Sequence, residues 1–505
     1  MREKTVKELS SVTSFGAIDA DADTLLDRCF QGHEAYLRAK SHERFLIIGR
    51  KGSGKTAIFK KMIKTRSPSV FTFGHTFSDY PWHHHDLQST AGVPEEDRYT
   101  HSWKYLILMT LSKILLNDDQ SQPWCEDVYD DLEKIEAFVV DSYGSRNPDV
   151  TQIFVPSKTL RINPTLGIPF TNFKVGLSLE RVPVSELPKV IQDVNRTVAA
   201  SVVRSLNPEH DYYICFDELD LGFDPRGATY SQRLTGLILA ARDLSRLARE
   251  EGKRFSVVVF LRDDIYQLLR FEDKNKVSEN HMSRIEWDAE GSNWTLKRLM
   301  EERFGAVLDS SPSGSWERVF DETQQMTGKQ TKYQHIRDRT FRRPRDMIKF
   351  CNEILIAYKR RADPRSNLFR NEDVSSARDP YSSYLLNELE DEVFKHVPEF
   401  GHIVEVLKVL GTLQFTKSEF SSVIDRRPDL LPEGLTVSDA LRKLFEFSLI
   451  AYLRTGGGGG GSGHIWCYLD PRARFDETAT HFRVHPGFKE VLALKRGGGG
   501  KDEDE

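Results

Sequence analysis

The sequence contains no long hydrophobic run, and this excludes a protein that spans a membrane through helices. A spanning helix needs roughly 20 consecutive apolar residues, and no stretch of the 505-residue chain approaches that length. The first residues, MREKTVKELSS, also contain no apolar segment of the kind found in signal peptides. We therefore expect a cytoplasmic protein that makes no membrane contact.

The sequence also lacks an excess of basic residues and has few cysteines, and each observation excludes some classes of protein. Basic residues are not in excess, since the formal net charge is −5. This charge argues against constitutive coating of nucleic acid, whose affinity comes mainly from neutralised phosphates, although a local basic surface remains open. Cysteine is rare and has no CxxC spacing, so we expect buried thiols in a reducing compartment, not a disulfide framework or a zinc site. The five cysteines are Cys29, Cys125, Cys215, Cys351 and Cys467.

The composition that is present is typical of a soluble globular chain, with 39% hydrophobic and 29% charged residues. The length indicates about three domains. Short apolar strands alternate with segments of helical periodicity in the first half of the chain, and this order predicts a parallel α/β sheet that is covered on both faces. The predicted strands are RFLIIG, VFTFGHTF, DYYICF and RFSVVVFLR, at residues 44–49, 70–77, 211–216 and 254–262.

Three segments within this core need separate interpretation. Residues 117–183 have mixed signals and are predicted to be an insertion, with a hairpin at residues 171–182. We interpret PWHHHD, residues 81–86, as a solvated loop, because consecutive side chains in a loop rarely converge on one metal ion. Trp103 to Leu116 is too short to span a membrane and is predicted to be a buried core helix.

The segment GRKGSGKT, residues 49–56, fits the pattern GxxxxGK[ST] between a predicted strand and a predicted helix. In such a loop, backbone N–H groups surround a β-phosphate, the lysine reaches the β- and γ-phosphate oxygens and the hydroxyl ligates Mg²⁺. The helix presents its positive end to the same anion. The flanking elements favour ATP and Mg²⁺ binding over a chance match in a glycine-rich turn. The predicted binding residues are Gly49, Arg50, Lys51, Gly52, Ser53, Gly54, Lys55 and Thr56.

A pair of acidic residues follows the strand YYICF. Asp217 is placed at the carboxyl end of this strand, where open α/β sheets bind their ligands. We expect Asp217 to hold Mg²⁺, and Glu218 to orient and deprotonate the attacking water. An acidic pair can also be a solvated turn. Together with the upstream loop, the pair predicts hydrolysis of ATP.

Three arginines are weaker candidates for contacts with the γ-phosphate. Arg262 lies at the end of the strand SVVVFLR, and the alternative for it is a surface ion pair with the following aspartates. Arg284 can be an arginine finger toward a neighbouring subunit or simply an exposed residue. Arg345 follows Pro344 at the start of a predicted helix. It can approach a bound phosphate or face water.

These motifs together resemble a family of bacterial P-loop ATPases with RKGSGK[ST] and RPRD signatures, which is similar to the wider STAND and AAA+ group that includes the origin-recognition ATPases. The resemblance rests on IIGRKGSGKTAI, YYICFDELD, VVFLRDD, MSRIEWD and RRPRDMIKFCNE in this order, and it covers about residues 15–358.

The resemblance implies a nucleotide-switched ATPase with a helical lid. Arg262 matches a sensor-1 arginine, Arg345 matches a sensor-2 arginine, and Arg284 lies where related proteins carry an inter-subunit arginine. Arg342 and Arg343 stand where many relatives have Gly-Asn, so the lid departs from the family pattern there.

The C-terminal third predicts a second fold. Three helical segments followed by IAYLR, a glycine tract and the returning strand HIWCYL have the order of a winged helix. The candidate recognition helix offers only Arg442 and Lys443, and the wing tip is glycine, so a clamp or protein-docking role is favoured over DNA binding. The predicted divisions are an ATPase core with an N-terminal lead-in at 1–290, a lid at 291–362, a linker at 363–380, a winged-helix-like domain at 381–496 and a disordered acidic tail at 497–505.

The sequence thus predicts a regulatory, Mg²⁺-dependent ATPase. By resemblance, such proteins act in bacterial defence, including antiphage defence, or in signalling, as homo-oligomers or with a partner effector protein. One alternative is a DNA-binding ATPase of the origin-recognition or loader type that acts through the winged helix. Another is a nucleotide-binding scaffold that hydrolyses nothing.

Overall fold

The protein is described by a computed structural model that covers residues 7–77, 80–87, 98–154, 159–160, 182–183, 187–222, 224, 227–361, 367–454 and 462–495. Its contacts divide the chain into two units. The α/β unit is Gly32–Arg50 with Gly54–Ile285, and the helical unit is Met1–Gln31 and Lys51–Ser53 with Glu286–Glu505.

The N-terminal residues differ from their predicted place in the ATPase core, since they are grouped with the helical unit. Two contacts within that unit explain the grouping. The rings of Phe15 and Phe304 meet edge to face, with centroids 4.7 Å apart. Arg303 Nη2 lies 2.6 Å from Asp23 Oδ2, and both side chains are buried.

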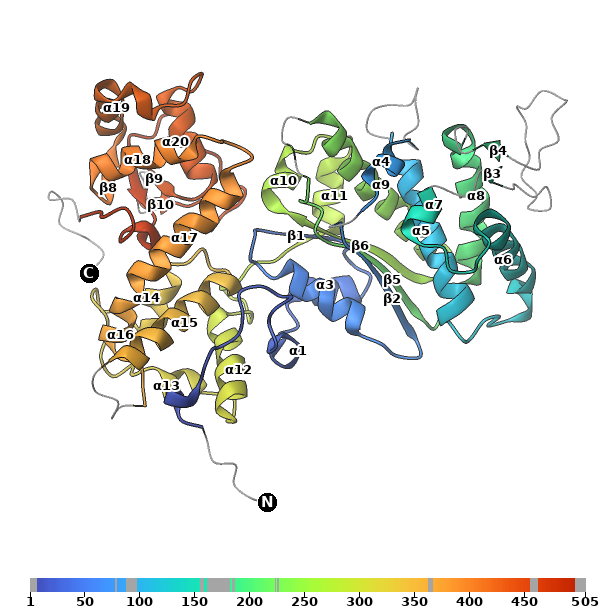
Figure 1. Ribbon diagram of the computed structural model, residues 1–505, viewed down its shortest axis with the longest axis horizontal. Coiled ribbons are helices and arrows are strands. Elements are labelled where there is room, and N and C mark those ends of the chain that lie inside the picture. Colours follow the sequence, from blue (N-terminus) through green and yellow to red (C-terminus); the bar gives the residue numbers. More distant parts are fainter. Residues whose placement is uncertain are drawn as a thin grey trace, which may run out of the picture. The chain divides into compact units, whose positions relative to one another are not determined.

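The α/β unit is built on a five-stranded sheet in the order β2-β5-β6-β1-β7, and every neighbouring pair is parallel (Figure 1). This confirms the predicted parallel α/β architecture and its strands. The strands are β1 (Leu46–Gly49), β2 (Val70–His75), β5 (Asp211–Phe216), β6 (Arg254–Arg262) and β7 (Met282–Arg284).

Alternating side chains explain how the sheet is covered on two faces. On β6, Val257, Val259 and Leu261 belong to the core cluster formed with α5 (Thr100–Lys113), α8 (Leu187–Ser205) and α9 (Ala228–Glu250). Phe260, which points to the other face, packs edge to face on Phe59 of α3 (Lys55–Lys64) at 6.0 Å between centroids. Because successive strand residues face opposite ways, the nearly continuous apolar run requires both layers.

The remaining elements of the α/β unit surround this sheet. The predicted buried helix at Trp103 is confirmed, since α5 buries most of its length and ends in a π-helical turn, Ile114–Asp118. The others are α2 (Glu34–Lys40), α4 (Trp82–Leu87), η4 (Glu126–Val128), α6 (Tyr129–Tyr143), α7 (Val150–Phe154), β3 (Thr159–Leu160), β4 (Val182–Pro183), α10 (Asp263–Leu268) and α11 (Lys274–His281).

The interpretation of the histidine-rich segment as a solvated loop is wrong. It forms α4, and His85 is fully buried. One ring nitrogen of His85 lies 3.0 Å from the Tyr80 hydroxyl and the other lies 2.7 Å from Ser102 Oγ. Burial lowers the pKa of His85 to about 3, so the ring is neutral. The polar sequence suggested exposure, but His85 packs among aromatic rings. A neutral imidazole with both ring nitrogens hydrogen-bonded can be buried at little cost in free energy.

The first part of the helical unit contains α1 (Leu26–Cys29) and, from residue 286 onward, α12 to α17. Arg343 is the N-cap of α15 and Pro344 is its first residue, as the sequence predicted. The short η1 (Leu9–Ser11) also belongs to this unit. Its helices are α1, α12 (Leu296–Leu308), α13 (Ser315–Val319), α14 (Lys332–Arg337), α15 (Pro344–Arg360), α16 (Asn371–Ser376) and α17 (Arg378–Val393).

The structure differs at the predicted linker, residues 363–380. Residues 362–366 lie outside the described part of the chain, but Phe369 is fully buried and bridges to Phe320. From Asn371 onward the chain is helical, and α17 runs across the predicted boundary at residue 381. The buried side chain of Phe369 is enough to hold this otherwise polar segment against the helical unit.

The last part of the helical unit combines three helices with a four-stranded antiparallel sheet in the order β10-β9-β11-β8. The predicted hairpin is present as β9 and β10, whereas β11 was not predicted, since its four residues lie between polar segments. The elements are α18 (Phe400–Leu410), β8 (Gln414–Thr416), α19 (Lys417–Arg426), η7 (Pro428–Leu430), α20 (Val437–Glu446), β9 (Ile450–Arg454), β10 (Gly463–Ile465), β11 (His481–Val484) and η8 (Pro486–Phe488).

Three sequence predictions fall on residues outside the described part of the chain: most of the hairpin at 171–182, most of the glycine wing tip, and the acidic tail at 497–505. Among the described residues, no helix is both long and apolar enough to cross a bilayer.

Candidate functional site

The second lysine of the segment GRKGSGKT, Lys55, starts a helix after the carboxyl end of β1. Gly54, with φ +107°, caps α3, and Lys55 is its first residue. This left-handed backbone is open to glycine and strained for other residues. Lys55 Nζ donates hydrogen bonds to the carbonyl oxygens of Gly49 at 2.9 Å and Arg50 at 3.1 Å. Burial lowers the pKa of Lys55, and the nearby carboxylates of Asp217 and Asp220 act in the opposite direction.

Asp217 follows β5 directly and is buried beside the loop helix. Its backbone N–H donates to the His75 carbonyl at 3.1 Å, and the Thr56 side chain hydrogen-bonds to its carboxylate. Burial raises the pKa of Asp217. Its Oδ2 is buried and has no hydrogen-bond partner among the described residues. A buried oxygen left in this state costs stability unless a ligand satisfies it.

Glu218 occupies the next position with a left-handed backbone, φ +60°. It begins a turn in which the Leu221 N–H donates to the Glu218 carbonyl at 3.2 Å. A non-glycine residue with positive φ is uncommon and recurs at functional sites. The turn therefore ends β5 abruptly and places both acidic residues at the strand's end.

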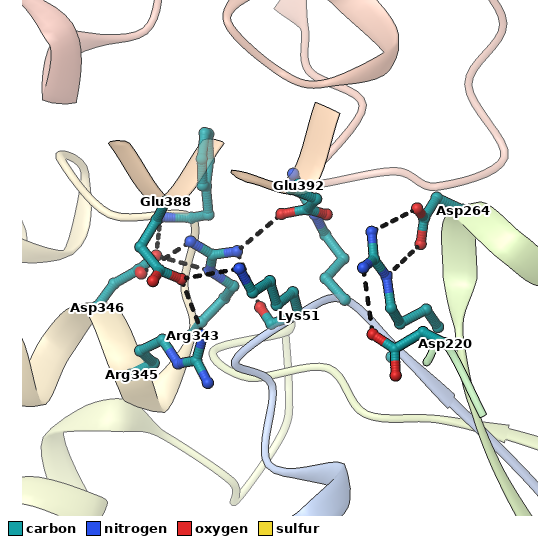
Figure 2. A network of polar contacts seen from close by, with 12 residues as sticks. Lys51, Asp220, Asp264, Arg343, Arg345, Asp346, Glu388 and Glu392 are labelled. Carbon is teal, nitrogen blue, oxygen red and sulfur yellow. Dashed lines mark hydrogen bonds and ion pairs between the residues drawn. The ribbon is translucent and has the colours of Figure 1, made fainter. Parts of the chain in front are cut away.

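Arg262 is the last residue of β6 and lies opposite Gly49 in the sheet register. Its guanidinium binds Asp264 through Nη2 at 2.7 Å and Asp220 through Nη1 at 3.3 Å. The two carboxylates are labelled in Figure 2. The side chain is mostly buried. The structure thus brings Arg262 to the same sheet edge as the loop and Asp217, but it pairs Arg262 with two carboxylates.

Arg284 lies on β7, next to β1, with Ile48 as its partner in the register. Its guanidinium forms an ion pair with Asp263 of the same chain. The side chain is mostly buried. For Arg284 to reach another subunit, it must first leave Asp263.

The middle of the loop, Lys51–Ser53, is held within the helical unit. Arg343 Nη1 donates to the Lys51 carbonyl at 2.8 Å, and Trp287 Nε1 donates to the Ser53 carbonyl at 3.0 Å. Gly52 has φ +79°, and a Cβ there would lie 2.9 Å from the Cβ of Arg345. Glycine at this position therefore permits both the turn and the close approach of α15.

Arg343 is a functional candidate that sequence reasoning did not single out. Its side chain is 3% exposed and makes two hydrogen bonds to Asp346, at 2.8 and 2.9 Å. Glu392 of α17 lies 3.5 Å away. Its partners therefore hold the pKa of Arg343 above the ordinary arginine value, although burial acts in the opposite direction. The i, i+3 spacing of Arg and Asp in RPRD is the local signal that could have found it.

Arg345 is also tied to α17. Its Nη1 lies 2.8 Å from Glu388 Oε2, and its Nε donates to the Ile18 carbonyl at 3.3 Å. Glu388 also lies 3.6 Å from Lys51 Nζ (Figure 2). Burial alone would raise the pKa of Glu388, but the charges of Arg345 and Lys51 lower it. One carboxylate thus faces two cations that the sequence assigned to phosphate binding.

The comparison with protein families matches only part of the chain. A model described as a FunZ-associated C-terminal helical domain matches residues 295–390, about a fifth of the sequence. In the structure this range begins at Thr295, the N-cap of α12, and ends within α17. The matched domain therefore contains Arg343, Arg345 and Glu388 and crosses the predicted linker. No curated protein matches the chain.

Proposed function

We propose that this protein is a Mg²⁺-dependent ATPase of the P-loop class, with an α/β unit of AAA+ or STAND type and a winged-helix-like domain at its C-terminal end. Three features support this proposal: the loop follows β1, Asp217 follows β5, and Arg262 ends β6. These strands are neighbours in the order β5-β6-β1. Parallel strands place their carboxyl ends at one edge, where open α/β sheets bind ligands.

The buried carboxylate of Asp217 carries the proposal. It lies against the hydroxyl of Thr56 and keeps one oxygen without a partner among the described residues. These are the oxygen donors that Mg²⁺ prefers beside nucleotide phosphates. Asp217 and Thr56 would therefore hold the metal, which when bound supplies charge neutralisation at the phosphates.

The chain's own residues divide the remaining work. Lys55, which now donates to two loop carbonyls, would turn its ammonium to the β- and γ-phosphate oxygens. Glu218 would accept a proton from the attacking water. Arg262 would exchange Asp220 or Asp264 for a γ-phosphate oxygen, because a dianionic phosphate group attracts guanidinium at least as strongly as a carboxylate does.

Two substitutions test binding and hydrolysis separately. Lys55→Ala removes the principal cation and should abolish most of the ATP affinity in calorimetry, whereas Lys64→Ala, at the other end of α3, should bind normally. Glu218→Gln should bind ATP and hydrolyse it roughly a hundredfold more slowly, the scale for a lost general base. Equal ATP binding by Lys55→Ala and wild type would end the proposal. Normal turnover by Glu218→Gln would reassign the base, with Asp220 as the next carboxylate to substitute.

We further propose that ATP binding changes the state of the helical unit and thereby controls a partner effector protein. The role would be in bacterial defence or signalling. Two observations support this coarser idea: the resemblance of the motifs, and the match of residues 295–390 to a helical domain that contains Arg345. Pull-down of a partner with and without ATP tests it, with Lys55→Ala as the control that cannot respond. Recovery of the same partners in every condition would contradict a switch.

The structure gives less support to the DNA-loader alternative. In α20, the helix that would read DNA in a winged helix, Arg442 pairs with Glu477 and with Asp439, the latter at 3.1 Å. Lys443 lies 2.8 Å from Glu446. Cations that are already paired release few counterions on binding DNA. We therefore favour protein docking for this domain. A steep fall of duplex affinity with salt would reverse that choice.

A further inference from the structure

A second cationic site lies at the opposite edge of the sheet from the phosphate loop. A pocket of about 390 Å³ opens between the C-terminal half of α9 and α11. Its lining includes Phe45 and His281, which directly precede β1 and β7, so it lies at the amino ends of the strands. β1 separates this edge from the loop by roughly 13 Å, at 3.3 Å per residue.

The walls of the pocket are positively charged. Four cations face one carboxylate among the lining residues, a net charge of +3. Three of the cations recur on one face of α9 with a spacing of four and three residues, which is helical. The lining cations are Arg242, Arg246, Arg249 and Lys276, and the carboxylate is Asp273.

These cations are incompletely neutralised. Arg249 forms no salt bridge with any residue that the structure describes. Arg246 is 3.9 Å from Glu250, near the limit of an ion pair. Arg242 donates to Asp243 at 3.0 Å, but Asp243 is shared with Lys104 at 2.7 Å. Only Lys276 has a partner of its own, Asp273, at 2.7 Å. The pocket therefore keeps an excess of positive charge.

The lining of the pocket also contains an unpaired polar atom. His281 stacks on Phe45 with ring centroids 5.2 Å apart, and its Nδ1 is buried without a hydrogen-bond partner among the described residues. Burial lowers the pKa of His281, and the charges of Arg249, Arg44 and Arg242 lower it further. A neutral ring nitrogen surrounded by guanidinium groups can donate to an anion that the arginines attract.

The neighbouring charges favour a compact ligand over an extended nucleic acid strand. A strand needs a track of unpaired cations along its backbone. Nearby arginines on this edge are already paired: Arg254 binds Asp211 at 2.7 Å, and Arg38 binds Glu34. The volume of the pocket is also that of a small-molecule site.

We propose that this pocket binds a compact anion with two or more phosphate groups, independently of the phosphate loop. Arg242 and Arg249 would hold the phosphates, Lys276 would add charge at the rim, and His281 would donate a hydrogen bond from the lining. The proposal does not depend on ATP binding or hydrolysis at the loop.

Inorganic pyrophosphate is a suitable probe of anion binding by this pocket. The measurements use the full-length Lys55→Ala variant, because it lacks the main cation of the loop. Calorimetry should show one site in this background. Substituting both Arg242 and Arg249 with Ala should weaken pyrophosphate binding about a hundredfold, since each charge-assisted contact accounts for about tenfold. Arg66→Ala, which removes an exposed arginine elsewhere in the α/β unit, should have no effect.

Two single substitutions keep the test valid if the double variant unfolds. Lys276→Ala removes an exposed side chain and should weaken binding severalfold. His281→Phe keeps the ring stacking on Phe45 but removes Nδ1, so it should weaken binding if the nitrogen contacts the ligand and leave it unchanged if His281 only packs.

Three results would overturn the proposal. The first is that Lys55→Ala does not bind pyrophosphate at millimolar concentration. The second is that pyrophosphate binding survives all the pocket substitutions. The third is that Arg66→Ala loses as much pyrophosphate affinity as the pocket variants do. A short oligonucleotide that binds more tightly than pyrophosphate, and is lost with the same substitutions, would replace the compact ligand with nucleic acid.

Discussion

At the scale of single residues, Asp217 shows how burial raises the free-energy cost of a charged side chain. Its carboxylate is almost inaccessible to water, and burial raises its pKa. A folded-state pKa above the unfolded value means that this group stabilises the fold at low pH, and that the contribution is lost as pH rises through the folded pKa. Ionisation of the buried carboxylate therefore lowers the stability of the fold.

We predict that Asp217→Asn raises the melting temperature of the ligand-free protein by a few degrees at neutral pH. The neutral amide avoids the burial of a charge, so the gap between variant and wild type should widen as pH rises from the ordinary aspartate pKa, about 4, through the raised pKa of the folded state. Thermal unfolding by fluorescence at several pH values measures it. Asp127→Asn, at an exposed position, should show no such gap. A variant that is less stable than wild type at every pH would contradict this account.

At the scale of elements, the N-terminus of α15 is joined to α17 by charge, not by apolar packing alone. Arg343 connects three groups, the Lys51 carbonyl, Asp346 and Glu392. Asp346 is fully buried and also accepts from the Phe341 N–H at 3.1 Å. Removing one partner of a buried ion pair leaves an uncompensated charge in the interior. This costs more stability than replacing both partners with apolar residues.

Arg343→Ala should therefore destabilise the helical unit by about 3–5 kcal/mol. Arg345→Ala is the matched control. Its side chain is partly exposed, and its partner Glu388 would still have Lys51 as a neighbouring cation. We therefore expect a loss of stability of about 1 kcal/mol. Urea unfolding followed by tryptophan fluorescence measures both. Equal losses in the two variants would mean that the buried network is not what stabilises α15.

If the loop binds ATP as we propose, Glu388 of α17 would compete with the phosphates for two cations. Its carboxylate lies 2.8 Å from Arg345 and 3.6 Å from Lys51, and ATP would compete with it for both cations. We predict that Glu388→Gln increases ATP affinity about tenfold, the equivalent of one charge-assisted contact. Glu353→Gln removes a carboxylate that pairs with Lys349 on α15 and should leave ATP affinity unchanged. Weaker ATP binding by Glu388→Gln would show instead that Glu388 positions the two cations.

At the scale of the whole molecule, we predict that nucleotide promotes a head-to-tail oligomer through Arg284. The ion pair with Asp263 adds a condition, since Arg284 must exchange one carboxylate for a phosphate of the next subunit. Light scattering with a slowly hydrolysed ATP analogue should show a mass increase in wild type and none in Arg284→Ala. Asp263→Asn releases the arginine and should assemble at lower protein concentration. An unchanged monomer mass in all three proteins would leave the trans site without support.

The sequence by itself determined the parts that depend on local order. The spacing of GRKGSGKT predicted a loop between β1 and α3, and the apolar runs predicted that Asp217 and Arg262 lie at the carboxyl ends of two strands. These predictions succeed because strand ends and helix starts are set by residues a few positions apart.

Only the tertiary structure decided which charges meet. It paired Arg284 with Asp263 and Arg262 with Asp220 and Asp264, brought Glu388 and Glu392 from α17 to the loop and α15, and buried His85 among aromatic rings. It also placed α11 against the arginines of α9. Periodicity shows which face of an element is apolar, but a charge's partner is fixed by the packing of segments far apart in the chain. For that reason the candidate residues were predictable and their contacts were not.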